Sequence, residues 1–493
     1  MKKLFLVSFV SLFLCSACSK KGSEDAMPES KTHSSAREIA STKVEFAKLL
    51  ASSLTNETVR NLIKNESLKK IDNEYDVLYH KVKNEKIDQK HSLEEIIISS
   101  YSGDKNDLKN RLKKDRLLTI LVPSFFSKKN WNTKEQIPLV AVRNEEGKLI
   151  AFNKDGESGE MNAMEIPDFP IIVVKGNDRI TTDVELDDNK NLSARKSSSN
   201  YLANIEGVNY YFNDPSFNPS LEKSGRMIFF NSTSDLNNAY QSTVNCNYCT
   251  QRDYLYYGIN SSTTSGPLNN KYAEAITAMR LSDKSIFDYL GGWDEGAYIF
   301  KYVVLFGNRT QSEVASSSDN VKVISVYPED LFVYHEEKRG GFLGMWEYTV
   351  KVIDDVAEYA FPSPVTFVTW DMEKYGDRWK ISVEEYDQAV TIEKTIKETS
   401  TFGSNFSTTA GVSTKVNTTF GGTTTFSKET SLKYSTTEGS DELGSATMQW
   451  TFPVITSSMT APFPFSSNQR LGTVFALNTG SVNISFETVR IIP

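Results

Sequence analysis

The sequence predicts an α+β protein in which antiparallel β structure predominates. Three observations lead to this fold class. Apolar residues recur at helical spacing between residues 40 and 116, short aliphatic and β-branched runs follow from residue 117, and the tract Thr391–Gly439 alternates with a period of two. We therefore expect a small N-terminal helical region followed by β-rich domains that carry a long amphipathic hairpin.

The chain begins with the pattern of an export signal. Met1-Lys2-Lys3 supplies positive charge, and Leu4–Leu14 supplies an apolar run that is too short to span a membrane. The run ends in Cys15-Ser16-Ala17-Cys18, which resembles the bacterial lipobox, with Cys15 where Leu is usual. The resemblance implies a lipoprotein signal peptide at residues 1–17 and lipidation of Cys18 by acyl chains such as palmitate. An ordinary signal peptide cleaved elsewhere is the alternative.

The residues after Cys18 bear on location. Ser19 at this position resembles outer-membrane rather than inner-membrane sorting, and residues 18–39 are polar, so we expect a flexible tether. Acylation of a lipobox cysteine supplies more than one chain, which anchors a protein stably where one chain would be marginal. We therefore expect the membrane as a partner and the cell envelope, at the outer membrane, as the location. The side of the membrane stays open.

The net charge and the length of the chain limit its expected partners and its number of domains. The formal net charge is −8 and no broad basic field is present, so we do not expect nucleic acid as a partner. No second long apolar run follows Leu14, and hence no transmembrane helix is predicted. Removal of the signal peptide leaves a chain too long for one hydrophobic core, which favours about two to four domains.

The expected helical region at 40–116 shows apolar stripes and capping residues. Val44, Ala47 and Leu50 lie on one stripe, and a second stripe begins after Asn56, a good N-cap residue. Ser92-Leu93-Glu94-Glu95 matches a capping box, in which the serine and the second glutamate satisfy each other's backbone N–H groups.

From residue 117 the pattern changes to strands. Short runs rich in aliphatic residues are broken by turn residues such as Pro123 and Gly176-Asn177-Asp178. We expect a β-rich middle domain at 117–330, with a short helix at Ser285–Leu290 before a strong strand at Ala297–Phe306. A β-rich C-terminal domain at 331–493 then carries the hairpin.

In the hairpin tract the large apolar residues share even-numbered positions. Gly421-Gly422-Thr423 is a turn signal, and a three-residue loop there keeps all apolar groups on one face. This loop predicts a register in which Phe420 pairs with Thr424, Thr418 with Phe426, Val412 with Leu432 and Ala410 with Tyr434. The candidate residues of the apolar face are Phe402, Phe406, Val412, Val416, Phe420, Phe426, Leu432 and Tyr434.

Two interpretations of this hairpin stay open. It can lie over the core of an exported β-rich domain, or it can insert into a membrane, since a spanning strand needs only about 9–11 residues. The Ser/Thr-rich alternation resembles the stem segments of aerolysin-type β-pore-forming toxins, and the resemblance implies oligomers for the second interpretation only. Lys394, Glu398 and Lys428 count against it, because they share the apolar parity.

The remaining cysteines and histidines offer little catalytic chemistry. For Cys246-Asn247-Tyr248-Cys249 in an exported protein we expect a local disulfide, with a free dithiol as the alternative. Of the four histidines, His335 alone lies in the expected C-terminal domain, and a surface turn explains it as well as catalysis does. Among common catalytic motifs, no GxSxG, HExxH, P-loop or GxGxxG sequence is present.

Acidic residues near the ends of two expected strands form a candidate calcium site. Asp371, Asp377 and Asp387 follow or flank Val365–Trp370 and Trp379–Val383, and oxygen ligands on loops suit Ca²⁺. The pattern faintly resembles a calcium-binding loop of C2 domains. Solvated turn carboxylates are the alternative, and Ca²⁺ is therefore a possible cofactor.

Together these features predict a non-enzymatic binding or interaction module of the cell envelope. Its β-rich body would present a surface to a glycan or to another protein. A pore-forming protein that inserts the 391–439 hairpin is the first alternative. A hydrolase that uses paired carboxylates is the second, because such chemistry needs no histidine.

Overall fold

The chain adopts the expected α+β fold, with β structure predominating. The structure is a computed structural model of the 493-residue chain. It describes residues 29–127, 131–184, 200–221, 227–229, 233–246, 249–258, 268–307, 319–386, 391–403, 425–437, 441–458 and 473–492. Within these ranges no helix has the length and apolar character needed to cross a membrane.

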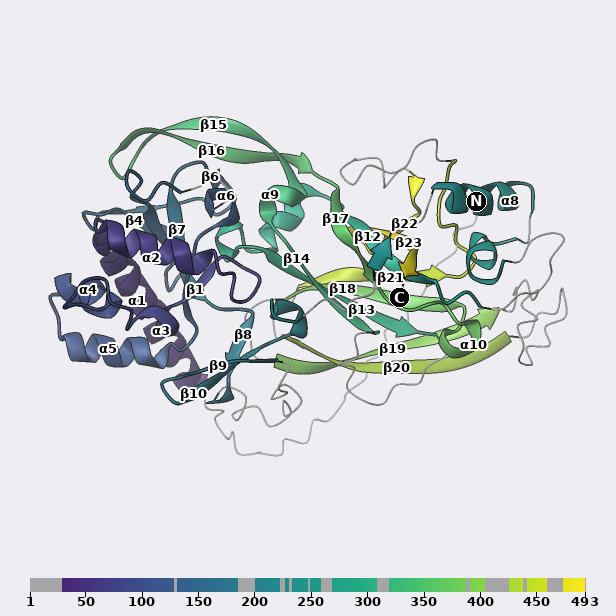
Figure 1. Cartoon of the computed structure of the whole chain (residues 1–493), viewed down its shortest axis with the longest axis horizontal. Helices are drawn as coiled ribbons and strands as arrows, with labels where there is room; N and C mark the ends of the chain where they lie inside the picture. Colours follow the sequence, from purple (N-terminus) through teal and green to yellow (C-terminus); the bar gives the residue numbers. More distant parts are fainter. Residues whose placement is uncertain are drawn as a thin grey trace, which may run out of the picture.

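The helices formed by residues 29–114 gather at one end of the molecule, on the left in Figure 1. They are α1 (Glu29–Ser53), α2 (Glu57–Ser67), α3 (Tyr79–Val82), α4 (Leu93–Ile97), η1 (Ile98–Ser100) and α5 (Lys105–Lys114). The expected caps are present: Asn56 accepts from the N–H of Thr58, and Ser92 and Glu95 form the reciprocal capping box. Local sequence therefore defines where α2 and α4 begin.

These helices pack against a sheet with strand order β1-β2-β7-β3-β4-β5. Its strands are β1 (Asp76–Leu78), β2 (Leu118–Leu121), β3 (Leu139–Arg143), β4 (Leu149–Phe152), β5 (Ser158–Glu160) and β7 (Ile171–Gly176), and the short α6 (Ser124–Ser127) follows β2. Pairing is antiparallel except between β3 and β7. Strands from both the expected helical region and the middle domain meet in this one sheet.

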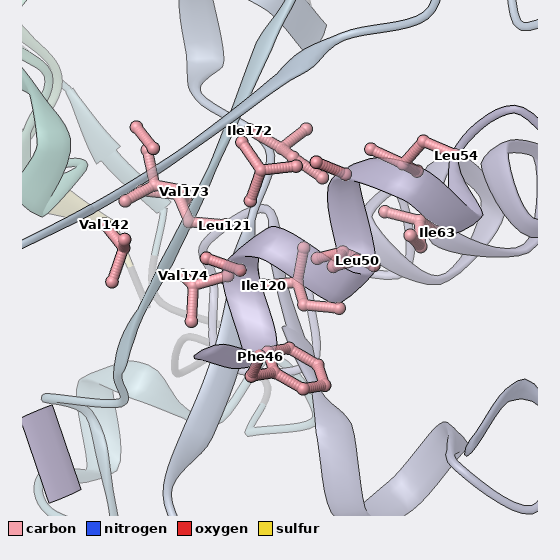
Figure 2. Close-up of a cluster of buried hydrophobic side chains, with 14 of the residues drawn as sticks. Phe46, Leu50, Leu54, Ile63, Ile120, Leu121, Val142, Ile172, Val173 and Val174 are labelled. Atoms are coloured by element: carbon pink, nitrogen blue, oxygen red, sulfur yellow. The ribbon is translucent and has the colours of Figure 1, made fainter. Parts of the chain in front are cut away.

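Helices and sheet share a hydrophobic core (Figure 2). Phe46, Leu50 and Leu54 of α1 lie on one stripe and are fully buried, as the helical period requires. They pack with Ile63 of α2 against aliphatic side chains of the sheet: Ile120, Leu121, Val142, Ile172, Val173 and Val174. The helical stripe is thus the cover of this sheet.

Two further sheets build the C-terminal half. One has the order β11-β23-β12-β17, with β22 on β23, and the other has the order β14-β13-β18-β21. Their strands are β11 (Met227–Phe229), β12 (Tyr272–Leu281), β13 (Tyr298–Phe306), β14 (Val321–Val326), β17 (Tyr359–Thr366), β18 (Arg378–Glu385), β21 (Glu442–Gln449), β22 (Ala476–Asn478) and β23 (Val482–Ile492). Trp370 and Trp379 stack at 4.0 Å between ring centroids in the core between these sheets.

Shorter elements surround these sheets. A small sheet has the order β8-β10-β9, formed by β8 (Ile180–Thr182), β9 (Tyr201–Ile205) and β10 (Val208–Phe212). The other helices are η4 (Pro215–Phe217), α8 (Thr233–Val244), η5 (Asp253–Tyr257), η6 (Lys284–Asp288), η7 (Trp293–Glu295), α9 (Pro328–Leu331) and α10 (Met372–Tyr375). The helix expected at Ser285–Leu290 is η6, a 3₁₀ helix, and the strand expected at Ala297–Phe306 is β13.

A long hairpin joins the two halves. β15 (Phe332–Phe342) and β16 (Met345–Val356) reach over the N-terminal sheet, where β16 pairs with β6 (Ile166–Pro167) (Figure 1). Leu343 and Gly344 form its turn with φ of 48° and 87°, a backbone region that favours glycine at the second position. His335 lies on β15, so the expected surface turn is a strand instead.

The second long hairpin is the one that the parity pattern predicts. β19 (Thr391–Gly403) pairs antiparallel with β20 (Thr425–Thr437). The predicted register is wrong: Leu432 pairs with Ile396 rather than Val412, Tyr434 with Lys394 rather than Ala410, and Phe426 with Phe402 rather than Thr418. Even positions still oppose even positions, because any even shift preserves the shared face. The predicted turn at Gly421-Gly422-Thr423 and four candidate residues (Phe406, Val412, Val416 and Phe420) lie outside the described residues.

Candidate functional site: the docked hairpin

The hairpin β19–β20 covers the outer face of β13. Alternation along β13 sends Phe300, Tyr302 and Val304 into the core between the sheets, whereas Val303 and Leu305 point to the other side. There they pack against Leu432 and Tyr434 of β20, which are buried, with Ile396 of β19 partly buried beside them. β13 is therefore buried on both faces, and one of the covers is the hairpin.

Polar contacts accompany this apolar packing. The buried carboxylate of Glu384, on β18, accepts hydrogen bonds from the Tyr434 hydroxyl and from Nζ of Lys394, the latter at 3.4 Å. Nζ of Lys394 also lies 3.1 Å from Oε1 of Glu442 on β21. We call the set of these residues the docking patch: Ile396, Leu432, Tyr434 and Lys394 on the hairpin, with Val303, Leu305, Glu384 and Glu442 on the body.

Electrostatics within the patch favour a protonated lysine and a neutral tyrosine. Burial lowers the pKa of Lys394, but the ion pairs with Glu384 and Glu442 outweigh it and leave the pKa raised. Burial, reinforced by the hydrogen bond to Glu384, raises the pKa of Tyr434. Nζ of Lys301 lies 5.9 Å from the centre of the Tyr434 ring. The patch therefore combines apolar contact with paired charge.

The structure explains why the charged residue Lys394 occupies an even-numbered position, among the apolar residues of the hairpin. Its charge counted against membrane insertion in the sequence, because it shares the face of Ile396 and Phe402. In the folded chain Ile396 packs against the body, and Nζ of Lys394 lies near the carboxylates of Glu384 and Glu442. The charge therefore matches the docked position of the hairpin.

Backbone pairing separates the hairpin from the body. β19 and β20 pair with each other along 13 residues each, from Thr391 with Thr437 to Gly403 with Thr425. In the parts of the chain that the structure describes, neither strand forms a ladder with a third strand. Side chains alone therefore account for the described packing of this hairpin on the body.

The candidate calcium ligands lie on different local structures. Oδ1 of Asp371 accepts from the N–H of Lys374 at the start of α10, at 3.1 Å. Burial raises the pKa of Asp377, whose carboxylate lies 3.7 Å from the guanidinium of Arg378. Asp387 lies outside the described residues. Among the residues that the structure describes, no group of three or more His, Cys, Asp or Glu side chains could hold a metal ion.

Cys246 and Cys249 form a disulfide just after α8. A buried ion pair follows it in the chain: Arg252 donates to both carboxylate oxygens of Glu274, at 2.9 and 3.2 Å. Tyr256 and Thr488 also donate hydroxyl groups to this carboxylate, at 3.0 and 2.9 Å. Next to Arg252, the carboxylate of Asp253 accepts from the indole N–H of Trp450 at 3.1 Å.

Sequence reasoning missed this buried cluster. Glu274 lies in β12 among apolar neighbours, and its partner Arg252 lies 22 residues earlier, at the N-terminal end of the π-helix η5. A glutamate inside a strand of alanines and isoleucine was the available signal, because an ionised group in such a run needs a partner. The cluster holds the π-helix η5 against β12 and β23.

A second buried network joins the N-terminal half to β13. Glu74 accepts from the backbone N–H of Ala297 at 3.0 Å, and Arg179 donates to Glu74 at 3.4 Å. The side-chain amide of Asn177 donates to Asp72 and Asp76, at 2.8 and 3.2 Å. Burial raises the pKa of both aspartates. All three carboxylates are buried, and Glu74 contacts both halves of the chain.

The histidines do not assemble a catalytic centre in the described structure. His335 is exposed on β15 and its Nδ1 lies 2.8 Å from Oδ1 of Asp354 on β16. His80 is buried, with Nε2 at 2.9 Å from the carbonyl oxygen of Asp115, and burial lowers its pKa. A neutral His80 donating to that carbonyl is a structural contact.

Comparison with protein-family models, curated proteins and solved structures finds no match.

Proposed function

We propose that this chain is a lipid-anchored cell-envelope protein that inserts the hairpin of residues 391–439 into a membrane. The observation that carries the proposal is the docking of β19–β20 through side chains, without a described backbone ladder to the body. Such a hairpin can leave β13 as a unit and keep its own backbone hydrogen bonds. That matters because unpaired backbone groups are costly in lipid.

The strength of the docking is compatible with release. Fully burying an aliphatic or aromatic side chain contributes about 1.5–3 kcal/mol. Leu432 and Tyr434, with part of Ile396, therefore contribute roughly 4–8 kcal/mol before the ion pairs are counted. Burial of a longer apolar stripe in lipid can offset a cost of this size.

Strand length and sequence favour the same conclusion. Each arm has 13 residues, more than the roughly 9–11 that a tilted spanning strand needs. The sequence between the arms continues the alternation, with Phe406, Val412, Val416 and Phe420 on the apolar parity. It contains no aspartate or glutamate from residue 404 to 424. The one charged residue in this stretch, Lys415, lies on the polar parity, away from the apolar residues.

Dye release from vesicles tests the proposal. Mature chain is added to phosphatidylcholine and phosphatidylglycerol vesicles that hold a fluorescent dye, with Lys394→Cys and Glu442→Cys joined by a short bismaleimide as the locked form. We expect release by the unmodified chain and its loss in the locked form. Absence of leakage by the unmodified chain at high concentration rejects the proposal.

The chain offers a matched control for the linker. Lys338 and Glu347 form another cross-strand pair, at 2.6 Å and exposed, on the β15–β16 hairpin. The same linker between cysteines at these two positions adds the same chemistry without tying β19–β20 to the body. Dye release should survive this modification.

Binding to a glycan or protein is a second candidate, favoured by Trp346. This side chain is 95% exposed next to the turn of β15–β16, where Leu343 and Met345 pack against the N-terminal core. Exposed aromatic residues are enriched at binding surfaces because they bury a large area on contact. A glycan and lipid array with Trp346→Ala as the comparison tests it. Equal binding by both chains contradicts a role for this side chain.

A further inference from the structure

We infer that the released hairpin pairs with a second copy of this chain, with β20 of one copy antiparallel to β19 of the next and the register shifted by two residues. The inference rests on the proposed function, because it names the partner of the same hairpin. It makes a separate claim about which strand edges meet and at which residues.

The outer edges of β19 and β20 can pair with another strand. Among the described strands, β19 and β20 pair only with each other, so the outer edge of each 13-residue strand carries backbone donors and acceptors that no described strand uses. An edge of this length is a template for another strand. A second copy supplies an edge of matching length and composition.

Parity restricts how the two edges can meet. Apolar residues occupy even positions in both strands, and the register inside the hairpin places even opposite even. An odd shift between copies would place the apolar face of one strand beside the polar face of the other. Even shifts therefore remain, and charge distinguishes among them.

The register inside the hairpin places no charge opposite a charge. Lys433 pairs with Thr395, Glu429 with Thr399 and Lys428 with Ser400. In the proposed contact between copies, each residue of β20 faces the β19 residue two positions before its partner in the hairpin. This shift changes all three pairs. Lys433 then stands opposite Glu393, Glu429 opposite Lys397, and Lys428 opposite Glu398. Three opposite-charge pairs thus form in one register, and directly opposed charges of opposite sign stabilise a sheet.

Other registers lack this complementarity. A shift of two residues in the opposite sense places Lys433 opposite Lys397, which is repulsive, and aligns no opposite charges. Pairing of β19 with β19, or of β20 with β20, repeats a single kind of ion pair twice, such as Glu393 with Lys397. The pairing of β20 with β19 also leaves one edge open at each end, so that further copies can add.

Charge reversal tests the pairing in trans. One variant carries Glu393→Lys and Lys397→Glu, and the other carries Glu429→Lys and Lys433→Glu. Each alone places two like-charge pairs at every contact between copies, whereas an equal mixture restores opposite charges when the two variants alternate. Assembly on phosphatidylcholine and phosphatidylglycerol vesicles, and in buffer, is measured by chemical crosslinking and sedimentation.

We expect each variant alone to assemble poorly and the mixture to recover most of the wild-type assembly. Recovery in the mixture cannot come from contacts inside one hairpin, because each hairpin keeps its own reversed charges. Failure of the mixture to recover overturns the inference, as does normal assembly of either variant alone. Melting temperatures of both variants show whether the fold is intact, and one chain carrying all four changes should assemble alone if it folds.

Cysteine pairs placed in separate chains test the register. A chain with Glu393→Cys is mixed with a chain with Lys433→Cys, and a mixture of Thr395→Cys with Lys433→Cys represents the unshifted register. We expect the first mixture to form at least about fivefold more disulfide-linked dimer, since directly opposed Cβ atoms lie closer than diagonal ones. Equal or reversed yields, or equal linking of the Glu393→Cys chain to itself, overturn the inference.

Dye release measured in the same samples distinguishes failure of membrane insertion from failure of the pairing between copies. Leakage without the shifted crosslink leaves membrane insertion standing and rejects this pairing. The shifted crosslink without leakage supports the pairing and rejects insertion.

Discussion

The hydroxyl of Tyr434, on β20, donates a hydrogen bond to the buried carboxylate of Glu384, on β18. Lys394, directly opposite Tyr434 in the hairpin, meets the same carboxylate at 3.4 Å. One carboxylate of the body thus contacts both arms of the hairpin. This contact makes Glu384 the natural position at which to weaken docking without changing the hairpin.

Replacing Glu384 with glutamine should loosen the docked hairpin. The change removes the negative charge that Lys394 faces and should cost about 1–3 kcal/mol of docking free energy. We expect faster proteolysis within 391–437 and dye release at lower protein concentration. Glu336→Gln, at an exposed position on β15, is the matched control and should change neither measurement. Unchanged proteolysis in Glu384→Gln contradicts a docking role.

Replacing Arg252 with methionine should destabilise the C-terminal half strongly. It leaves the buried carboxylate of Glu274 without its cation, and breaking such a pair costs about 3–5 kcal/mol. Chemical denaturation measures the loss. Lys338→Met removes one partner of an exposed pair with Glu347, whose charges solvent screens, and should cost far less stability. Similar losses in both variants would be inconsistent with this account.

Stability should depend on pH through Asp253. Burial raises the pKa of this carboxyl to about 6, even though Thr250 and Trp450 donate hydrogen bonds to it. The folded chain therefore binds a proton more tightly than the unfolded chain. The stability that this provides is complete below the unfolded pKa of about 4 and is lost as pH rises through 6.

The variant Asp253→Asn isolates this contribution. Wild type should lose roughly 2–3 kcal/mol more unfolding free energy than the variant as pH rises from 4 to 7. Denaturant titrations at several pH values give the difference between the two chains, which cancels the titration of Asp72 and Asp76. Parallel profiles for the two chains would refute the assignment.

Reduction of the Cys246–Cys249 disulfide should have a modest effect. The bridge spans a sequence separation of three residues, and closing so short a loop contributes about 2 kcal/mol in the chain-entropy description. Thermal unfolding with and without a reductant measures the shift, and Cys246→Ser with Cys249→Ser should remove the dependence on reductant. A large loss of structure on reduction would show that α8 depends on the bridge.

Much of the local structure was predictable from neighbouring residues. Ser92 and Glu95 form a capping box because the atoms that meet are three residues apart. The stripe of Phe46, Leu50 and Leu54 faces a core because its spacing matches the helical period. The even parity of Ile396, Phe402, Phe426 and Leu432 likewise predicted two strands with a shared face.

Tertiary structure decided the register of that hairpin, its docking partner and the buried ion pairs. Every register that differs by an even number of residues keeps Leu432 on the apolar face, so the sequence pattern does not select one of them. In the folded chain Leu432 is opposite Ile396 and packs against Val303 and Leu305. Arg252 with Glu274, and Glu384 with Tyr434, join residues far apart in the chain. The spacing of apolar residues predicts which face of a helix or strand a side chain lies on, because the direction of the side chain depends on the local backbone. The spacing does not predict which segment covers that face, because the free energy of the contact depends on residues from two segments that are distant in the sequence.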